Sequence, residues 1–319
     1  EASLLGTFVT TSPVLAPNGV NNTAYASTNN GIDGDDVTIV GNGNTRTVTI
    51  ETSDTAKATA TKINAVAGAT TVFAQARTAA LLRSSSSTDL SYTVKINNVE
   101  TAAFTLSSAG VTDAVTKINA ITASTGVMAA ATTDGKVLLS DSNGDDITIE
   151  NTSTQTTLFV AAVENDGKTT AAAGGEDNLL ASGGTDLTTI SGTIRLTSTE
   201  GFTVTQATAI GAGASFFTDG EVAASLSSVS SIAVTDTIGA SDALAVIDGA
   251  LDTVSAMRGS LGTLQNRLDY AVSNLMKVTE YTIGSRSRIQ DADFAAETSR
   301  LAKAQVLQQA GASMLAQAN

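Results

Sequence analysis

Cysteine, histidine and tryptophan are all missing from this chain, and its only two prolines, Pro13 and Pro17, lie near the start. Without cysteine or histidine there are no thiolate or imidazole metal ligands, no Ser-His-Asp or Cys-His catalysis and no disulfides. Aromatic residues make up only 4% of the chain, which is little for stacking on sugars or bases. We therefore expect a non-enzymatic protein without a cofactor.

Basic residues are also scarce, and the net charge of −14 is unevenly distributed. The first 240 residues carry 10 basic and 23 acidic side chains, whereas the residues from Ser241 onward carry 7 and 8. An acidic chain disfavours nucleic-acid binding, because phosphate contacts need a basic face. A nearly neutral segment is compatible with close lateral packing, and an acidic one suits a solvated exterior.

Long apolar runs are absent too. No stretch approaches the roughly 18–20 apolar residues of a membrane span, so no membrane insertion is expected. A basic and then apolar signal peptide is not visible at Glu1, so no cleaved signal peptide is expected.

Short β-branched segments separated by Gly, Asn and Asp follow an irregular lead-in over residues 1–30. The string Thr61-Lys-Ile-Asn-Ala65 recurs 55 residues later as Thr116-Lys-Ile-Asn-Ala120, each time within a strand–short helix–strand pattern. Two weaker echoes relate 34–39 to 144–149, and the apparent hairpin 135–149 to 192–204. We expect repeated small α+β modules, two of them within residues 31–150, and a further β-rich region with a connector over 151–240, in which the Thr/Ala/Gly-rich part of 150–190 forms loops.

From Ser241 the pattern changes to a long amphipathic helix, with Ser241 and Asp242 as the expected start. Heptads counted from Leu244 give an unbroken apolar d row, whereas Arg258 and Gln265 make the a row polar in the middle. The predicted seam consists of Leu244, Ile247, Leu251, Val254, Leu261, Leu268, Val272 and Leu275. A helix of about 40 residues is roughly 60 Å long and needs partners along its length. The alternative is a helix packed on the sheet of its own domain.

A break near Gly284 is expected to end this helix, so that the predicted segments are 241–284 and 285–319. Asp291 or Asp293 would cap a second, alanine-rich helix from about Phe294. Its larger apolar residues include Leu301, Leu307 and Met314.

These C-terminal strings resemble bacterial flagellin over roughly Leu244–Asn319. The strings that carry the likeness are Leu261-Gly-Thr-Leu-Gln-Asn-Arg-Leu268, Ser285-Arg-Ser-Arg-Ile-Gln-Asp-Ala-Asp-Phe294, Ala304-Gln-Val-Leu-Gln-Gln-Ala-Gly311 and Met314-Leu-Ala-Gln-Ala-Asn319. The Thr-Lys-Ile-Asn-Ala repeats are similar to the small insert modules of many flagellins. The resemblance implies an α+β protein with a long coiled-coil-like helical core segment and β-rich outer domains. It also implies that the chain is a piece of a longer subunit, whose N-terminal helices pair with these C-terminal ones.

The family implies an exported filament subunit that serves motility, on the bacterial flagellum outside the cell. Implied partners are other flagellin subunits, an export chaperone and a cap protein; the innate immune receptor for flagellin would contact Val272 and Leu275. Inter-subunit contacts are expected from Arg286, Arg288, Asp291, Asp293, Phe294, Leu301, Leu307 and Met314.

Alternative functions are a surface adhesin or glycan-binding protein, and a hook–filament junction protein. The acidic clusters Asp33-Gly-Asp-Asp36 and Asn143-Gly-Asp-Asp146 could supply oxygen ligands to Ca²⁺. Neither cluster fits the twelve-residue calcium loop, and turns before strands favour the same residues, so no metal site is predicted.

Overall fold

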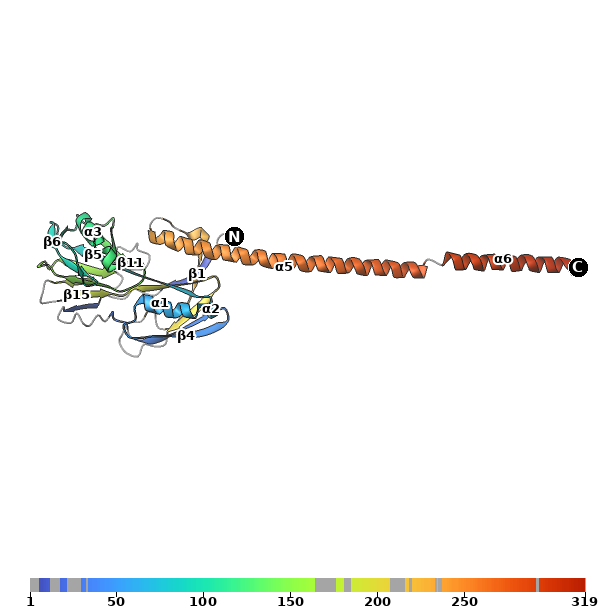
Figure 1. Cartoon of the computed structure of the whole chain (residues 1–319), viewed down its shortest axis with the longest axis horizontal. Coiled ribbons are helices and arrows are strands. Elements are labelled where there is room, and N and C mark those ends of the chain that lie inside the picture. Colours follow the sequence, from blue (N-terminus) through green and yellow to red (C-terminus); the bar gives the residue numbers. More distant parts are fainter. Residues whose placement is uncertain are drawn as a thin grey trace. The chain divides into compact units, whose positions relative to one another are not determined.

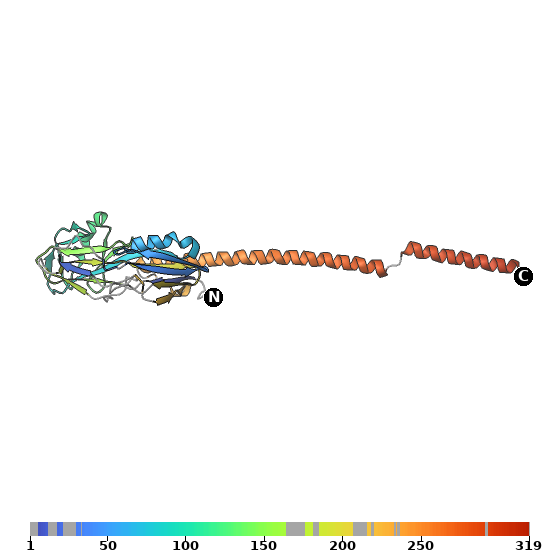
Figure 2. The same cartoon turned by 90° about the horizontal axis from the view of Figure 1, so that it is seen from below.

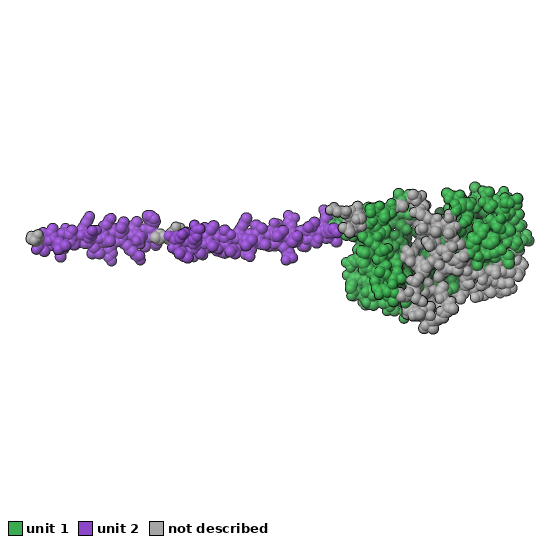
Figure 3. Space-filling view, turned by 180° about the vertical axis from the view of Figure 1, so that it is seen from behind, with its two compact units in different colours: residues 1–254 green, residues 255–319 purple. Residues whose placement is uncertain are grey.

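The computed structural model describes residues 6–11, 18–21, 30–32, 34–163, 176–180, 185–206, 216–217, 220–232, 234, 237–290 and 293–318. The chain divides into a β-rich unit over residues 1–254 and a helical unit over residues 255–319 (Figure 3). An α+β protein with a long C-terminal helical segment is therefore confirmed. Among the described residues, no helix is both long and apolar enough to cross a membrane.

Strands of the β-rich unit form four sheets among the described residues. The largest contains β1 (Gly6–Thr11), β5 (Phe73–Ser84), β10 (Met128–Ala131), β11 (Val137–Asp141), β13 (Leu158–Ala162), β14 (Glu176–Leu179), β16 (Thr193–Ser198) and β19 (Ser225–Ser228). The second contains β2 (Asn18–Asn21), β7 (Val94–Ile96), β8 (Val99–Glu100), β12 (Ile147–Asn151) and β15 (Thr185–Ile190). The third contains β3 (Asp35–Gly41), β4 (Asn44–Ile50), β17 (Phe202–Gln206) and β18 (Gly220–Ala223), and the fourth pairs β6 (Leu90–Tyr92) with β9 (Phe104–Leu106).

Two modules of the same design make up most of the β-rich unit. In module 1 the chain runs from β4 through α1 (Ala56–Ala65) and α2 (Ala67–Thr70) into β5. In module 2 it runs from β9 through α3 (Thr112–Asn119) and α4 (Thr122–Thr125) into β10. The labelled helices α1 and α3 lie in separate parts of the unit (Figure 1). The predicted strand–helix–strand repeat is therefore confirmed.

The threonine, the isoleucine and the asparagine of the repeated string have the same roles in both modules. Ile63 and Ile118 are fully buried, as expected for the apolar side of a short helix packed on a sheet. Thr61 and Thr116 each donate a hydrogen bond to the carbonyl four residues earlier, both at 2.8 Å. The asparagines bind the backbone of the strand that follows. Asn64 and Asn119 therefore explain why the string recurs.

Module 2 is inserted into module 1. One buried core gathers residues from 32–76 and again from 194–217, while the other gathers residues from 80 to 190. The twelve-residue strand β5 joins them, because its first half pairs with β16 and its second half with β11 and β13. This nesting differs from the predicted division at residue 150, since a sequence pattern does not reveal that the chain returns to its first core.

Neither predicted hairpin forms. β11 pairs with β10 and β5, whereas β12 pairs with β15 and β7. In the same way β16 pairs with β1 and β5, whereas β17 pairs with β3 and β18. The likeness of 135–149 to 192–204 is nonetheless meaningful, because both segments cross from one sheet to another. The echo of 34–39 in 144–149 relates β3 and β12. These strands belong to different sheets: β3 lies between β4 and β17, and β12 lies between β7 and β15.

Two regions predicted to be irregular contain strands. β1 and β2 lie within residues 1–30, and β13, β14 and β15 lie within the Thr- and Gly-rich part between 150 and 190. β1 is held between β16 and β19, whose residues are far away in the sequence. Such pairing depends on tertiary context, which local composition does not report. The Thr169–Gly175 stretch lies outside the described residues.

The helices α5 (Thr237–Gln290) and α6 (Phe294–Gln317) follow one another along the chain (Figures 1 and 2). α5 begins before the predicted cap Ser241, and it runs through Gly284 instead of breaking there. One glycine costs a helix only about 1 kcal/mol, which a helix of 54 residues tolerates. Arg286 also donates a 3.1 Å hydrogen bond to Gln290 within the last turns.

Candidate functional site: the uncovered helical surface

The first turns of α5 pack on the β-rich unit through one face. Ala243, Val246 and Ala250 are buried there. Thr7 of β1 donates a 3.1 Å hydrogen bond to the carbonyl of Ala245. A Cβ added at Gly249 would lie 2.1 Å from the Thr7 hydroxyl, so the helix and the strand are in close contact.

An ion pair fixes the same part of α5. The Arg195 guanidinium on β16 lies 2.6 Å from the Asp242 carboxylate, and only 9% of its side chain is exposed. Burial lowers the pKa of Arg195, while the Asp242 charge opposes that shift. Asp242 thus binds Arg195 from within the second turn of α5, and it does not start the helix as the sequence predicted.

The predicted seam lies on a different side of α5. Its eight apolar residues are all between 37% and 63% exposed. The residues concerned are Leu244, Ile247, Leu251, Val254, Leu261, Leu268, Val272 and Leu275. Within the β-rich unit, the alternative of a helix packed on the sheet of its own domain applies to the first turns of α5, through another face.

The two polar a positions in the middle of the seam, Arg258 and Gln265, result from counting in strict heptads. A straight α-helix drifts relative to a seven-residue repeat by about 20° per heptad. Met257 and Leu264, each one residue before a polar a position, are about half exposed and continue the apolar row past Arg258 and Gln265. Counting with the 3.6-residue period finds both residues from the sequence alone.

Other exposed apolar residues extend this surface toward the end of α5. Val272, Leu275, Met276 and Ile283 surround a hollow on the helix together with Thr279 and Glu280. Val278, Tyr281 and Ile289 are also exposed. The sequence prediction missed the residues beyond Leu275, because it followed a single row.

α6 begins as predicted. Asp293 is its N-cap, and its carboxylate accepts hydrogen bonds from the amides of Ala295 and Ala296 at 3.1 and 3.2 Å. The predicted apolar residues of α6 are all at least 60% exposed: Phe294, Leu301, Leu307 and Met314. Asp291 lies outside the described residues. Arg286 and Arg288 lie on the last turns of α5, not in a break between helices.

The carboxylates of the acidic motif at 143–146 have protein partners. Asp145 forms a 2.6 Å ion pair with Lys57, and Asp146 accepts a 2.9 Å hydrogen bond from Asn30. Burial, with Asp145 nearby, raises the pKa of Asp146 to about 7. Asp35 and Asp36 begin β3, and Asp33 lies outside the described residues. In the part that the structure describes, no group of three or more carboxylates is arranged to hold a metal ion.

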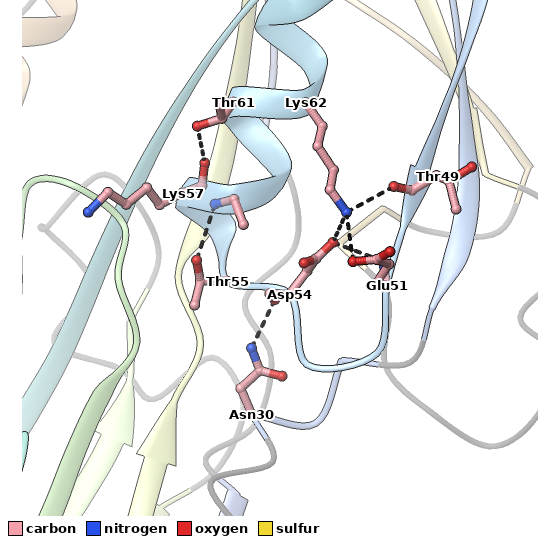
Figure 4. Close-up of polar contacts among 9 residues, drawn as sticks. Asn30, Thr49, Glu51, Asp54, Thr55, Lys57, Thr61 and Lys62 are labelled. Carbon is pink, nitrogen blue, oxygen red and sulfur yellow. Dashed lines mark hydrogen bonds and ion pairs between the residues drawn. The ribbon is translucent and has the colours of Figure 1, made fainter.

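Ion pairs also fix the start of α1. Thr55 caps the helix by accepting a hydrogen bond from the amide of Ala58, and Lys62 reaches back to Asp54 at 2.7 Å and Glu51 at 3.5 Å (Figure 4). Asn30 donates to the carbonyl of Asp54 in the same view. These polar groups therefore stabilise the module.

The fold and the surface together define a class of protein: a β-rich unit with its own buried cores, continuous with helices whose larger apolar residues are mostly exposed among the described residues. Residues 244–319 match the family model of the bacterial flagellin C-terminal helical region. The segment that matches the family model is thus the same segment that carries the exposed apolar residues.

Relatives agree with this match. The chain is 38% identical to the B-type flagellin of Pseudomonas aeruginosa over 226 residues, which is 67% of this chain and 44% of that protein. It is 51% identical to polar flagellin A of Vibrio parahaemolyticus, and 49% identical to a flagellin B of Vibrio cholerae, over 90 residues that make up 28% of this chain and 24% of each relative. The chain spans less than half the length of these curated relatives. It belongs to the bacterial flagellins, a family of structural proteins.

Proposed function

We propose that this chain is part of a structural subunit of the bacterial flagellar filament, and that it assembles through the apolar surface of α5 and α6. One observation carries the proposal: the predicted seam on α5 is about half exposed along its length, and its residues lie within the segment that matches the flagellin helical region. No observation favours an adhesin or a hook–filament junction protein. The proposed function follows from an uncovered surface in a segment that matches proteins named flagellins.

Burial of the seam supplies a driving force of useful size. A fully buried Leu, Ile or Val contributes about 1.5–3 kcal/mol relative to an exposed one. The seam residues are roughly half exposed, so each has about 1 kcal/mol left to contribute when another helix covers it. Part of this gain is offset by the cost of association. Several subunits contacting one another along the helices can overcome that cost.

Charge supports the same division of roles. The nearly neutral residues from Ser241 onward form the proposed core segment, and the more acidic first 240 residues form the proposed outer region. Like charges repel over distances of about 8–10 Å in physiological salt. An acidic exterior therefore keeps neighbouring filaments apart, while neutral helices can pack closely.

Polar contacts between subunits complete the proposal. Arg286, Arg288 and Asp293 would form them at the junction of α5 and α6, with Asp291 as a further acceptor. The partners are other flagellin subunits, with an export chaperone and a cap protein during assembly. The location is the flagellum outside the cell, and Val272 and Leu275 would also contact the innate immune receptor.

The direct experiment introduces Leu261→Glu and Leu268→Glu into the complete gene product, expressed in a bacterium that lacks its own flagellin. We expect the double variant to be secreted but absent from filaments, because two carboxylates would have to be buried among apolar side chains. Thr263→Glu is the matched control, since it adds a charge on the same turns but outside the apolar row. Normal filaments from the double variant would contradict the proposal.

A second experiment tests the polar contacts. Charge reversal at both Arg286 and Arg288 should lower the yield and thermal stability of filaments, whereas reversal at Arg300, which already lies 3.7 Å from Glu297, should have a smaller effect. Unchanged filaments from the first variant would remove these residues from the interface.

A further inference from the structure

β10 is an edge strand of the largest sheet. It pairs with β11 on one side, and among the described residues no strand pairs with its other side. The amides and carbonyls of alternate residues face that open side. An edge of this kind is a template on which another chain can add a strand.

Side chains from the end of α3 and from α4 occupy this open edge instead of a strand. Asn119 donates a 2.9 Å hydrogen bond to the carbonyl of Ala129 and accepts a 2.8 Å hydrogen bond from its amide. The Asn119 side-chain amide thus forms the two hydrogen bonds with Ala129 that a residue of a neighbouring strand would form. Thr122 donates to the carbonyl of Val127 at 2.8 Å, and Thr125 accepts from its amide at 3.2 Å.

Common protections of an edge strand are missing from β10 itself. Residues 126–133 contain no charged residue and no proline. Met128, Ala130 and Ala131 are exposed, so the strand presents an uncharged surface with mostly small side chains. Natural sheets usually protect such an edge with charges, proline, a bulge or a covering element. Here the hydrogen bonds from Asn119, Thr122 and Thr125 take that role.

We propose that Asn119, supported by Thr122 and Thr125, closes the edge of β10 against strand addition by a second copy of this chain. Without the Asn119 amide, the backbone of Ala129 is free to pair with β10 of another copy. Antiparallel pairing of the two identical edges forms a symmetric, self-limiting contact. These hydrogen bonds prevent the β-rich units of two copies from associating through β10. This proposal does not rest on the proposed function of the helices.

Module 1 provides an internal comparison. Asn64 makes the same pair of hydrogen bonds to Ala74, at 2.9 and 2.8 Å. Here the strand is β5, and from Thr78 onward β11 pairs with it on the side that Asn64 caps. The segment after β11 continues along this side, since a Cβ added at Gly144 would lie 2.3 Å from that of Ala76 and Thr78 donates a 2.7 Å hydrogen bond to the Asp145 carbonyl. Removal of Asn64 therefore opens no usable edge.

The test compares Asn119→Ala with Asn64→Ala in the whole chain. Each variant loses the same two hydrogen bonds, so both should lose similar thermal stability. Sedimentation velocity over a range of concentrations should show up to about a twofold rise in weight-average mass for Asn119→Ala relative to the parent chain, and no rise for Asn64→Ala. Any association through the helices would be the same in the parent chain, Asn119→Ala and Asn64→Ala. It therefore does not affect the difference in mass between them.

A third variant shows where the contact lies. Ala130→Lys added to Asn119→Ala places a charge on the opened edge and should restore the mass of the parent chain. The proposal is overturned if Asn119→Ala does not associate more than Asn64→Ala, or if the added lysine leaves the association unchanged.

Discussion

Gly249 provides a sharp test of how α5 joins the β-rich unit. Alanine is favoured over glycine inside a helix by about 1 kcal/mol, so Gly249→Ala would stabilise a helix in isolation. In this chain the new Cβ would lie 2.1 Å from the Thr7 hydroxyl and 3.3 Å from the Gly6 carbonyl oxygen. Thr7 must therefore rotate or the helix must move.

Both ways of relieving the contact cost free energy. Rotation of Thr7 gives up its hydrogen bond to Ala245, worth about 0.5–1.5 kcal/mol. Forcing an extra methyl group into a packed site typically costs about 1–3 kcal/mol. Together these costs come to about 1.5–4.5 kcal/mol, so after the gain of about 1 kcal/mol in helix propensity we expect Gly249→Ala to lower the free energy of unfolding of the β-rich unit by about 0.5–3.5 kcal/mol.

Gly259→Ala on the same helix is the matched control, because its added Cβ would point into open space, with no neighbour within 4 Å beyond the adjacent helix backbone. It should be neutral or stabilise by up to about 1 kcal/mol. Urea unfolding followed by circular dichroism and tyrosine fluorescence measures both effects, since Tyr92 is fully buried in the β-rich unit. Thr7→Ala should partly rescue Gly249→Ala by removing the hydroxyl. Equal stability of Gly249→Ala and Gly259→Ala would refute the proposed packing.

Three further perturbations test the charges and turns of the β-rich unit. Because the pKa of Asp146 is raised to about 7, its protonated form stabilises the folded state at low pH, and this contribution is lost as the pH rises through 7. The free energy of unfolding should therefore be higher at pH 5.5 than at pH 8, and Asp146→Asn should reduce that difference; an unchanged difference would contradict the assignment. The pKa values of Asp113 and Glu176 are lowered, by the Thr105 amide and by Arg83 respectively, so their stabilisation is lost only in acid below this pH range and does not interfere. Asp242→Ala should lower the free energy of unfolding by about 2–3 kcal/mol in urea, because it leaves the buried Arg195 without its ion-pair partner. Arg195→Met should lower it less, and the reverse order would refute the role of the pair. Gly144→Ala should cost about 2–4 kcal/mol, because its φ is +80° and its Cβ would lie 2.3 Å from that of Ala76, whereas Gly43→Ala, with φ +68° and open space, should cost only about 1–2 kcal/mol in thermal unfolding.

Repetition and periodicity made the main elements predictable. The recurrence of Thr-Lys-Ile-Asn-Ala located both short helices, since the same local pattern must bury Ile63 and Ile118 in equivalent ways. The apolar period located α5, and Asp293 followed by helix-favouring residues located the start of α6. Long, strongly periodic segments leave few alternative structures.

Tertiary context decided the remainder. The nested insertion depends on β5 pairing with β16 across more than a hundred residues, which no local pattern reports. The buried face of α5 consists of Ala243, Val246 and Ala250, two of them alanines that a hydrophobicity pattern does not distinguish from exposed ones. In the sequence, Gly249 is a residue that disfavours a helix. The structure explains it, because Thr7 lies so close that a Cβ at this position would clash with its hydroxyl.

Accessibility of the seam in assembled filaments tests the central proposal most directly. This chain contains no cysteine, so Leu268→Cys in the complete gene product adds a thiol at one seam position, and Thr133→Cys adds one at an exposed position of the β-rich unit. The labelling of each variant is compared with that of the parent protein. Maleimide labelling is measured on intact filaments and on the same filaments after dissociation. We expect the reactivity of Leu268→Cys to fall at least about tenfold on assembly, as for a side chain buried between subunits, while Thr133→Cys reacts equally in both states. Equal labelling of Leu268→Cys in filaments and free subunits would contradict assembly through this surface.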